Sequence, residues 1–278
     1  MYLAADRNLA DRIYEAGVGT GGIAGNWLNG ALMGWSCGAI EQDAMKKMAS
    51  DLKKDIGGDF IINIVGFSRG GVEALDFANQ VESSIQQGKS DFAGAQIGFL
   101  GLYDPVDSIN ASRDNAGGLN ITVPTGIAHV ADAVALSENR SLFDWINLIG
   151  SPNTTVIGFM GAHSDIGGGY ANDPISEETL SWMTGQAKAA GMVFTSTFPP
   201  AVFTAADIHD SWRGASGEDG GLYPFPTAPV ERKLPVGLMV YTSGGPVLYG
   251  TKSSSFWNPD FAGDESFYNS LSWGLLIA

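Results

Sequence analysis

Short apolar runs and helical periodicities alternate along most of the chain. Apolar runs typical of strands occur at 12–16, 60–65, 96–103 and 155–160, and the run at 60–65 predicts a buried strand. Apolar residues spaced three or four apart predict helices at 41–54, 71–85, 127–136 and 176–190. Two further runs, at 236–242 and 247–250, predict a terminal hairpin. Strands that alternate with helices in this way predict an α/β fold with a mostly parallel sheet.

Local signals refine two of these segments. Asp173-Pro174 precedes the helix at 176–190, Ser176 is its predicted N-cap, and Gly191 ends it. Residues 214–232 are rich in glycine and proline and predict a long surface loop. We see no internal repeat and no domain boundary, so we expect residues 1–278 to form a single domain, with 192–278 as a candidate cap or C-terminal elaboration.

Three polar residues follow three of the predicted strands. Ser68 lies in the pentapeptide Gly-Phe-Ser-Arg-Gly just after the strand at 60–65. Asp104 follows the strand at 96–103, and His163 follows the strand at 155–160. Because the carboxyl ends of parallel strands lie at one edge of a sheet, we expect these three side chains to meet there. Their order, Ser, Asp, His, is that of the catalytic residues of α/β-hydrolases.

These residue types fit nucleophilic attack on an ester. A serine hydroxyl needs a neutral imidazole to remove its proton, and a buried carboxylate orients that imidazole. The backbone N–H of Arg69 is the expected first oxyanion donor. Each residue alone also has an ordinary explanation. Ser68 and Asp104 could be turn residues, with Asp107 a nearby substitute for Asp104, and His163 could be a structural histidine in a glycine-rich loop.

Composition changes the picture mainly by exclusion. A chain of 278 residues that is 44% hydrophobic can bury a large core. The net charge of -15 argues against nucleic acid as a partner and against electrostatic docking on an anionic membrane. The single cysteine, Cys37, excludes an internal disulfide. We find no signal-peptide pattern and no apolar run of spanning length, so we expect synthesis in the cytoplasm without a signal peptide or transmembrane helix.

Three other patterns leave alternatives open. The run Gly-Val-Gly-Thr-Gly-Gly at 17–22 fits a dinucleotide-binding fingerprint, with Glu41 about 20 residues further on, but no clean helix follows it. His163, Asp165 and His209 could form a metal site, although no spacing demands one. His209 is also an alternative to His163 as the base, because it lies in a polar stretch at 205–214 that could enter the site from a loop.

Three motifs carry a resemblance to a known family. They are Gly-Phe-Ser-Arg-Gly-Gly at 66–71, Gly-Leu-Tyr-Asp-Pro-Val at 101–106 and Gly-Ala-His-Ser-Asp-Ile-Gly-Gly-Gly-Tyr at 161–170. Together with weaker matches at 14–22, 129–140 and 207–212, they resemble the α/β-hydrolase domain of bacterial type VI secretion lipase effectors and related fungal and bacterial proteins. The resemblance implies an α/β-hydrolase fold, a mostly parallel sheet with helices on both faces, and a triad of Ser68, Asp104 and His163.

The chain departs from this family at its start. Family members begin with an extra strand ending in Asp-Gly-Thr, and the loop after that strand is the expected second oxyanion donor. This chain starts downstream of that strand. Three explanations are open: the first strand is missing, Gly17 and Val18 supply the donor instead, or the site is impaired. The long C-terminal region that would contact membranes in the large effectors is also absent.

We therefore expect a serine esterase or lipase that hydrolyses carboxylic esters through an acyl-enzyme, with no cofactor and no metal. The resemblance implies phospholipid substrates, because the characterised secreted members attack membrane lipids of rival bacteria. It also implies export by a type VI system, a secretion-apparatus or immunity-protein partner and transient membrane contact. The alternative is a catalytically impaired hydrolase-fold module that binds a lipid or a partner.

Overall fold

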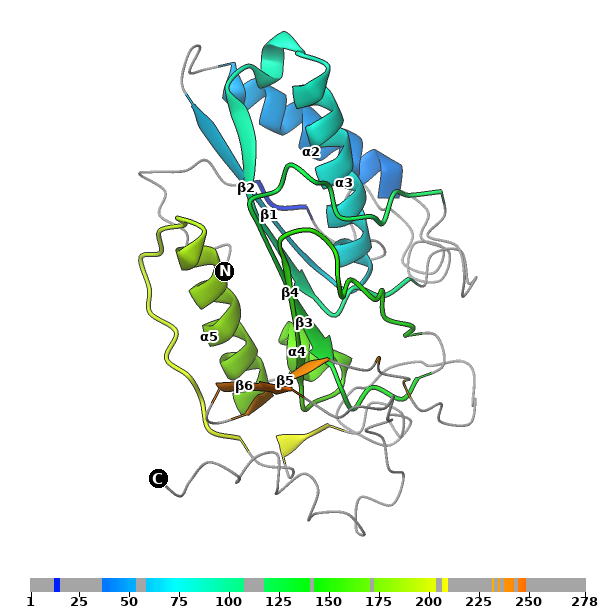
Figure 1. Ribbon diagram of the computed structural model, residues 1–278, viewed down its shortest axis with the longest axis vertical. Coiled ribbons are helices and arrows are strands. Elements are labelled where there is room, and N and C mark those ends of the chain that lie inside the picture. Colours follow the sequence, from blue (N-terminus) through cyan, green and yellow to red (C-terminus); the bar gives the residue numbers. More distant parts are fainter. Residues whose placement is uncertain are drawn as a thin grey trace.

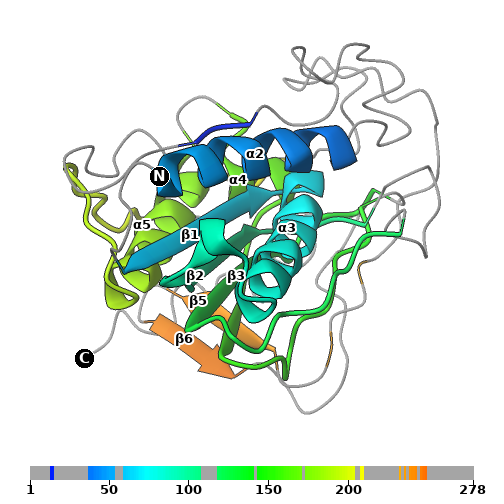
Figure 2. The same cartoon turned by 90° about the horizontal axis from the view of Figure 1, so that it is seen from above.

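A twisted sheet separates two groups of helices in the computed structural model of this chain (Figures 1 and 2). The structure describes residues 13–15, 37–53, 59–107, 118–140, 143–170, 173–203, 207–209, 232, 235, 238–242 and 245–248. In this part of the chain, no helix is both long enough and apolar enough to cross a membrane.

Within the described residues, the sheet has six strands that lie in the order in which they occur along the chain. They are β1 (Phe60–Phe67), β2 (Ala95–Tyr103), β3 (His129–Ala135), β4 (Thr154–Phe159), β5 (Met239–Thr242) and β6 (Gly245–Leu248). Strands β1 to β5 pair in parallel, and β6 pairs with β5 antiparallel as the terminal hairpin predicted from the sequence. The predicted α/β fold with a mostly parallel sheet is thus confirmed.

Helices cover both faces of this sheet. They are α2 (Cys37–Leu52), α3 (Arg69–Gln86), α4 (His163–Gly167) and α5 (Pro174–Ala189), with a short 3₁₀ helix, η3, at Ser90–Phe92. Helices α2 and α3 pack on one side of the strands and α4 and α5 on the other, as Figure 1 shows. Because β1 to β5 are parallel, each connection carries the chain back to the amino edge, and all five strands end at the opposite, carboxyl edge, where the candidate site lies.

Strand β3 lies in the middle of the sheet and contributes to both hydrophobic cores. Val130 and Val134 point into the core under α2 and α3. Ala131, Ala133 and Ala135 point into the core under α5. All five side chains are fully buried. Small alanine side chains on one face of the strand leave room for α5 to pack closely against it.

The predicted helix at 127–136 is wrong, because residues 129–135 form β3. A strand buried on both faces shows no alternation of apolar and polar residues, so its pattern lacks the usual period of two. Its alanines favour a helix, and the four-residue spacing of Val130 and Val134 mimics a helical face. The predicted strand at 12–16 is not found at 13–15, which have no regular structure; residues 12 and 16 lie outside the described residues.

Two further predictions are corrected in detail. The strand predicted as buried at 60–65 is β1, and Ile61 and Val65 on one of its faces are 59% and 41% exposed. The N-cap of α5 is Asp173 rather than Ser176. The Asp173 side chain accepts hydrogen bonds from the backbone N–H groups of Ile175 and Ser176. With Pro174 at the first helical position, this is a favoured arrangement for a helix start. The expected cap at 192–278 lies largely outside the described residues.

Candidate active site

Ser68 occupies a sharp turn between β1 and α3. Its backbone has φ 59° and ψ -129°, a combination that non-glycine residues rarely adopt. The Ser68 N–H donates to the Tyr103 carbonyl oxygen (3.0 Å), and the Ser68 carbonyl oxygen accepts from the Val106 N–H (3.2 Å). The end of the neighbouring strand β2 thus holds the turn in place. Backbone strain of this kind persists only where the surrounding structure enforces it, and it is concentrated at functional sites.

The glycines around Ser68 allow this turn to close. A Cβ on Gly66 would overlap the carbonyl oxygen of Gly70, and a Cβ on Gly71 would come within 2.9 Å of the Pro105 Cβ. The strand end, the first turn of α3 and the loop after β2 therefore approach more closely than any side chain would permit. This contact is the physical reason for the glycines in the motif at 66–71.

Asp104 follows β2 and is fully buried. Its Oδ1 accepts a hydrogen bond from the Ala135 N–H (3.0 Å), and its Oδ2 lies 2.7 Å from Nδ1 of His163. The Asp104 backbone has φ 43°, a second strained position at the carboxyl edge of the sheet. The structure thus brings together two of the three residues that the sequence singled out.

Arg232 forms a bidentate ion pair with Asp104 that the sequence did not reveal. Its Nη1 donates to Asp104 Oδ1 (2.6 Å) and its Nη2 to Asp104 Oδ2 (3.1 Å). The same guanidinium donates to the carbonyl oxygens of Ala135 and Phe143. Arg232 is 8% exposed, so the prediction of a surface loop at 214–232 is wrong at this residue.

The Arg232 charge decides the ionisation of Asp104. Burial alone would raise the pKa of Asp104, but the nearby guanidinium and the His163 hydrogen bond outweigh it and lower that pKa to about 2. An ionised carboxylate can only accept hydrogen bonds, so the His163 Nδ1 must be the donor. The other ring nitrogen, Nε2, therefore takes no part in the contact with Asp104.

His163 begins helix α4 and is held on several sides. The Phe67 ring stacks on the imidazole with centroids 4.6 Å apart, and the Phe143 ring meets it edge-on at 4.8 Å. Its backbone N–H donates to Glu138 Oε2 (3.1 Å). Phe67 directly precedes Ser68 in the chain, so the imidazole contacts the residue next to the predicted nucleophile. Among the described residues, however, no hydrogen bond joins the Ser68 hydroxyl to the His163 ring.

Glu138 is a buried carboxylate that supports the His163 backbone. Burial would raise the pKa of Glu138, but hydrogen bonds and charge from Arg140 lower it to about 2. The Arg140 guanidinium also lies 3.6 Å from the centre of the Phe143 ring that touches His163. A second buried ion pair thus fixes the surroundings of the imidazole.

His209, the alternative base, forms its own pair with Asp165. His209 Nδ1 lies 2.6 Å from Asp165 Oδ1, and the His209 N–H donates to Asp165 Oδ2 (3.2 Å). The Tyr170 ring stacks on the His209 ring at 3.7 Å. Burial raises the pKa of Asp165 to about 6, although backbone and side-chain hydrogen bonds from Ala162 and His209 act in the opposite direction.

The three glycines after His163 bring α4 close to its neighbours. A Cβ on Gly167 would overlap the Phe67 ring, and a Cβ on Gly169 would lie 2.8 Å from the Ser164 Cβ. Gly168 ends α4 with φ 83°, a left-handed conformation that favours glycine. The close approach of Gly167 is what lets Phe67 stack on His163.

The expected oxyanion donors are described only in part. Arg69 is the first residue of α3, so its backbone N–H belongs to the first turn of that helix. Gly17 and Val18 lie outside the described residues, as does the rest of the candidate dinucleotide fingerprint at 17–22. Glu41, the acidic residue of that fingerprint, lies within α2 and not at the end of a strand.

Comparison with known proteins identifies a related family for part of the chain. Residues 76–186 match the family described as "T6SS, Phospholipase effector Tle1-like, catalytic domain", which confirms the resemblance found in the sequence. Asp104 and His163 lie inside the matched segment, whereas Ser68 and Arg232 lie outside it. No curated protein matches the chain.

Two solved structures are similar to parts of the chain. One is the Tle1 effector bound to the VgrG spike from the Type 6 secretion system, with 21% identity and a TM-score of 0.36 over 50% of this chain and 32% of that chain. The other is an uncharacterized protein from Pseudomonas aeruginosa, with 20% identity and a TM-score of 0.41 over 63% of this chain and 28% of that chain. The matches thus span a third or less of the length of each of these two similar proteins.

Proposed function

We propose that this chain is a serine hydrolase that cleaves carboxylic esters through an acyl-enzyme. Ser68 is the nucleophile, His163 the general base and acid, and Asp104 the residue that orients the imidazole. The observation that carries the proposal is the buried 2.7 Å contact between His163 Nδ1 and Asp104, the residue after Tyr103, whose carbonyl oxygen accepts from the strained turn of Ser68. The family match of residues 76–186 supports it independently.

The geometry of His163 suits proton transfer at Nε2. With Nδ1–H donated to Asp104, neutral Nε2 can accept the Ser68 proton while Oγ attacks the ester carbonyl carbon. The resulting imidazolium then protonates the departing alkoxide, and water releases the acid in a second attack. The Ser68 side chain must rotate toward the imidazole for the first step, as hydrogen bonds at catalytic sites often form fully only when substrate binds.

The oxyanion is stabilised by backbone N–H groups. The Arg69 N–H, in the first turn of α3, is the first donor, and the positive end of the helix dipole favours negative charge at this point. We assign the second donor to the segment that contains Gly17 and Val18. Asp104 keeps its charge throughout because Arg232 holds its pKa near 2.

The family match also guides the proposed substrate and its delivery. The family is described as a phospholipase effector domain, so we propose phospholipids as the ester substrates, with transient membrane contact during turnover. One similar protein is a Tle1 effector bound to the VgrG spike. We therefore propose that this chain is exported by a type VI system in contact with a secretion-apparatus protein and is neutralised by an immunity protein in the producing cell. We propose one catalytic domain, with residues after 192 covering the acyl site.

The test compares wild type with Ser68→Ala and Ser83→Ala on p-nitrophenyl esters of graded acyl length and on dioleoyl phospholipid vesicles. Ser83 is an exposed serine on α3 and serves as the matched control. We expect Ser68→Ala to lose at least about 10³-fold in kcat/KM, because only oxyanion stabilisation and binding remain. Ser83→Ala should retain wild-type rates. Equal rates for wild type and Ser68→Ala would refute the proposal.

A second candidate is a hydrolase-fold module that binds a lipid or partner without turnover. The missing hydrogen bond between Ser68 and His163 in the described structure favours it. A fluorophosphonate probe separates the two candidates, because it labels only an activated serine. Labelling of wild type and Ser83→Ala but not of Ser68→Ala supports the enzyme, and an unlabelled wild type supports the binding module.

A further inference from the structure

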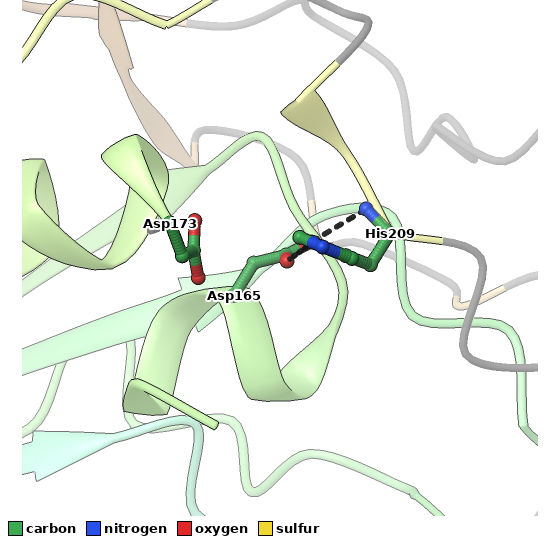
Figure 3. A group of neighbouring side chains, drawn as sticks. All are labelled: Asp165, Asp173 and His209. Atoms are coloured by element: carbon green, nitrogen blue, oxygen red, sulfur yellow. Dashed lines mark hydrogen bonds and ion pairs between the residues drawn. The ribbon is translucent and has the colours of Figure 1, made fainter. Parts of the chain in front are cut away.

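Asp165, Asp173 and His209 form a compact group beside the short helix α4 (Figure 3). Each offers a ligand atom, and these atoms all lie within 4.8 Å of one another. Asp165 and Asp173 are buried, and His209 is partly buried. Figure 3 shows the Asp173 carboxylate on one side of Asp165 and His209 on the other. Three separate segments thus meet here: α4, the start of α5, and the segment at 207–209.

The Asp173 carboxylate is only half used by the fold. Its Oδ1 caps α5 by accepting from Ile175 and Ser176. Its Oδ2 has no hydrogen-bond partner. This oxygen is buried, because the residue is only 2% exposed. An unpartnered carboxylate oxygen in the interior is costly unless something neutralises it. The cap alone does not account for this oxygen, because a single oxygen is sufficient for both hydrogen bonds.

We propose that Asp165, Asp173 and His209 together bind one divalent cation of the zinc type. Two carboxylates and one imidazole provide three protein ligands, and a water would complete a tetrahedral site. An imidazole nitrogen favours Zn²⁺ or a neighbouring transition ion over Ca²⁺ and Mg²⁺, which prefer oxygen ligands. The sequence pointed instead to His163, Asp165 and His209, but His163 is committed to Asp104, and Asp173 takes its place.

The present spacing needs only a small adjustment to accept the ion. Ligand atoms of a tetrahedral site with bonds of about 2.1 Å lie about 3.4 Å apart. The widest separation in the group, up to 4.8 Å, would shorten, and the 2.6 Å contact between His209 Nδ1 and Asp165 Oδ1 would open. The cation replaces the proton that now joins these two side chains.

A cation here would fasten the segment at 207–209 to α4 and α5. Asp165 lies two residues after His163 on α4, so the ion would also limit the motion of the helix that carries the imidazole. This role is structural and does not require ester hydrolysis. The proposed cation site can therefore be tested independently of the proposed function.

The test measures metal content and affinity in the full-length chain. Protein is stripped with EDTA and titrated calorimetrically with Zn²⁺, with Mn²⁺ and Ca²⁺ as comparison ions. We expect one Zn²⁺ per chain, a preference for Zn²⁺ over Ca²⁺, and a Tm that rises with Zn²⁺ concentration. Wild type that binds no Zn²⁺ with defined stoichiometry overturns the proposal.

The variants Asp173→Asn and His209→Gln test the assignment. Asparagine caps helices as well as aspartate does, so Asp173→Asn keeps the start of α5 while removing the charge at the unpartnered oxygen. Loss of even an outer-sphere partner weakens metal sites by about 10–100-fold, so losing a ligand should cost at least about tenfold in Zn²⁺ affinity. His129→Gln is the matched histidine control, because His129 lies on β3 and contacts Gln186 instead.

Two outcomes would contradict the assignment even if Zn²⁺ binds. Unchanged affinity in Asp173→Asn would mean that the ion is elsewhere, and weakened affinity in His129→Gln would place it at β3. If His209→Gln fails to fold, Asp173→Asn still decides, because its helix cap is intact.

Discussion

Two Asp–His pairs each include a residue of the short helix α4, and they differ in what surrounds the carboxylate. In the pair Asp104–His163, the carboxylate accepts from a guanidinium, and its pKa is lowered to about 2. In the pair Asp165–His209, backbone amides and the imidazole are the donors, and burial raises the carboxyl pKa to about 6. The two pairs thus have similar distances between carboxylate and imidazole, but the carboxyl pKa is shifted in opposite directions.

The difference suggests different roles for the two pairs. A carboxylate that stays ionised can fix one tautomer of its histidine through every step of a reaction. A carboxylate without a charged partner in a buried pocket is more stable when it shares a proton or binds a cation. The predictions for Arg232 and Glu41 test whether a guanidinium is what separates the two kinds of buried carboxylate, and those for Asp104 and Gly167 test what orients His163.

The largest effect is expected from Asp104→Asn. The change replaces the charged carboxylate that fixes the His163 tautomer with a neutral amide, which can donate to the imidazole, and the corresponding change in serine hydrolases lowers kcat by about 10⁴-fold. The control is Asp132→Asn, another buried aspartate, which accepts a hydrogen bond from Trp145 Nε1 (3.1 Å) and whose pKa burial raises well above its usual range. Ester hydrolysis at saturating substrate measures both. Equal loss in the two variants would mean that the effect is structural.

The next effect concerns Arg232, which only the first pair contains. Arg232→Gln leaves the Asp104 charge buried without its partner, so we expect a loss of about 3–5 kcal/mol in the free energy of unfolding. Urea unfolding monitored by tryptophan fluorescence measures it.

A double-mutant cycle gives this prediction its control. Adding Asp104→Asn to Arg232→Gln removes the unpaired buried charge. The double variant should therefore lose less stability than the sum of the losses in the two single variants. Additive losses would show that the two side chains do not stabilise each other.

A smaller effect is expected at the contact between α4 and β1. Gly167→Ala would push the Phe67 ring away from His163. We expect a loss of about 1–3 kcal/mol in stability, as for other overpacked sites, together with a lower kcat. The control is Gly185→Ala in α5, where an added Cβ meets nothing within 4 Å. That variant should gain about 0.5–1 kcal/mol from the helix preference of alanine. A Gly167→Ala chain with unchanged kcat would show that the ring does not position His163.

The sequence predicted the pair Asp104–His163 because both residues follow parallel strands, whose ends must share an edge. The same reasoning predicts Ser68 as the nucleophile, and the structure shows the glycines that its turn requires. Strand β3 was missed because a strand buried on both faces loses its alternation, and its alanines favour a helix.

Arg232 was missed for a different reason. It lies 128 residues from Asp104 in a stretch rich in glycine and proline, and an arginine there gives no local sign of burial. Asp173 was recognised only as preceding a helix, since nothing in the sequence shows that one of its oxygens is left over. Long-range partners of charged groups depend on the tertiary fold and leave no periodic pattern.

The last prediction tests the rule on a carboxylate outside both pairs. Glu41 on α2 accepts a hydrogen bond from Gln80 (2.8 Å). Two causes raise the pKa of Glu41 from 4.5 to about 8: mainly its burial, and next the negative charge of the nearby Asp76. The folded chain therefore binds a proton that the unfolded chain releases between these two pH values. Stability contributed by Glu41 is full below about pH 4.5 and falls as the pH rises toward about 8.

Glu41→Gln removes this dependence, because glutamine stays neutral at every pH. Urea unfolding of the two proteins should give similar stabilities below pH 4.5, with the variant gaining on wild type up to about pH 8. A constant difference between the two curves would contradict the raised pKa. It would then follow that burial without a guanidinium does not by itself keep a carboxyl protonated in this fold, and the contrast between Asp104 and Asp165 would need another cause.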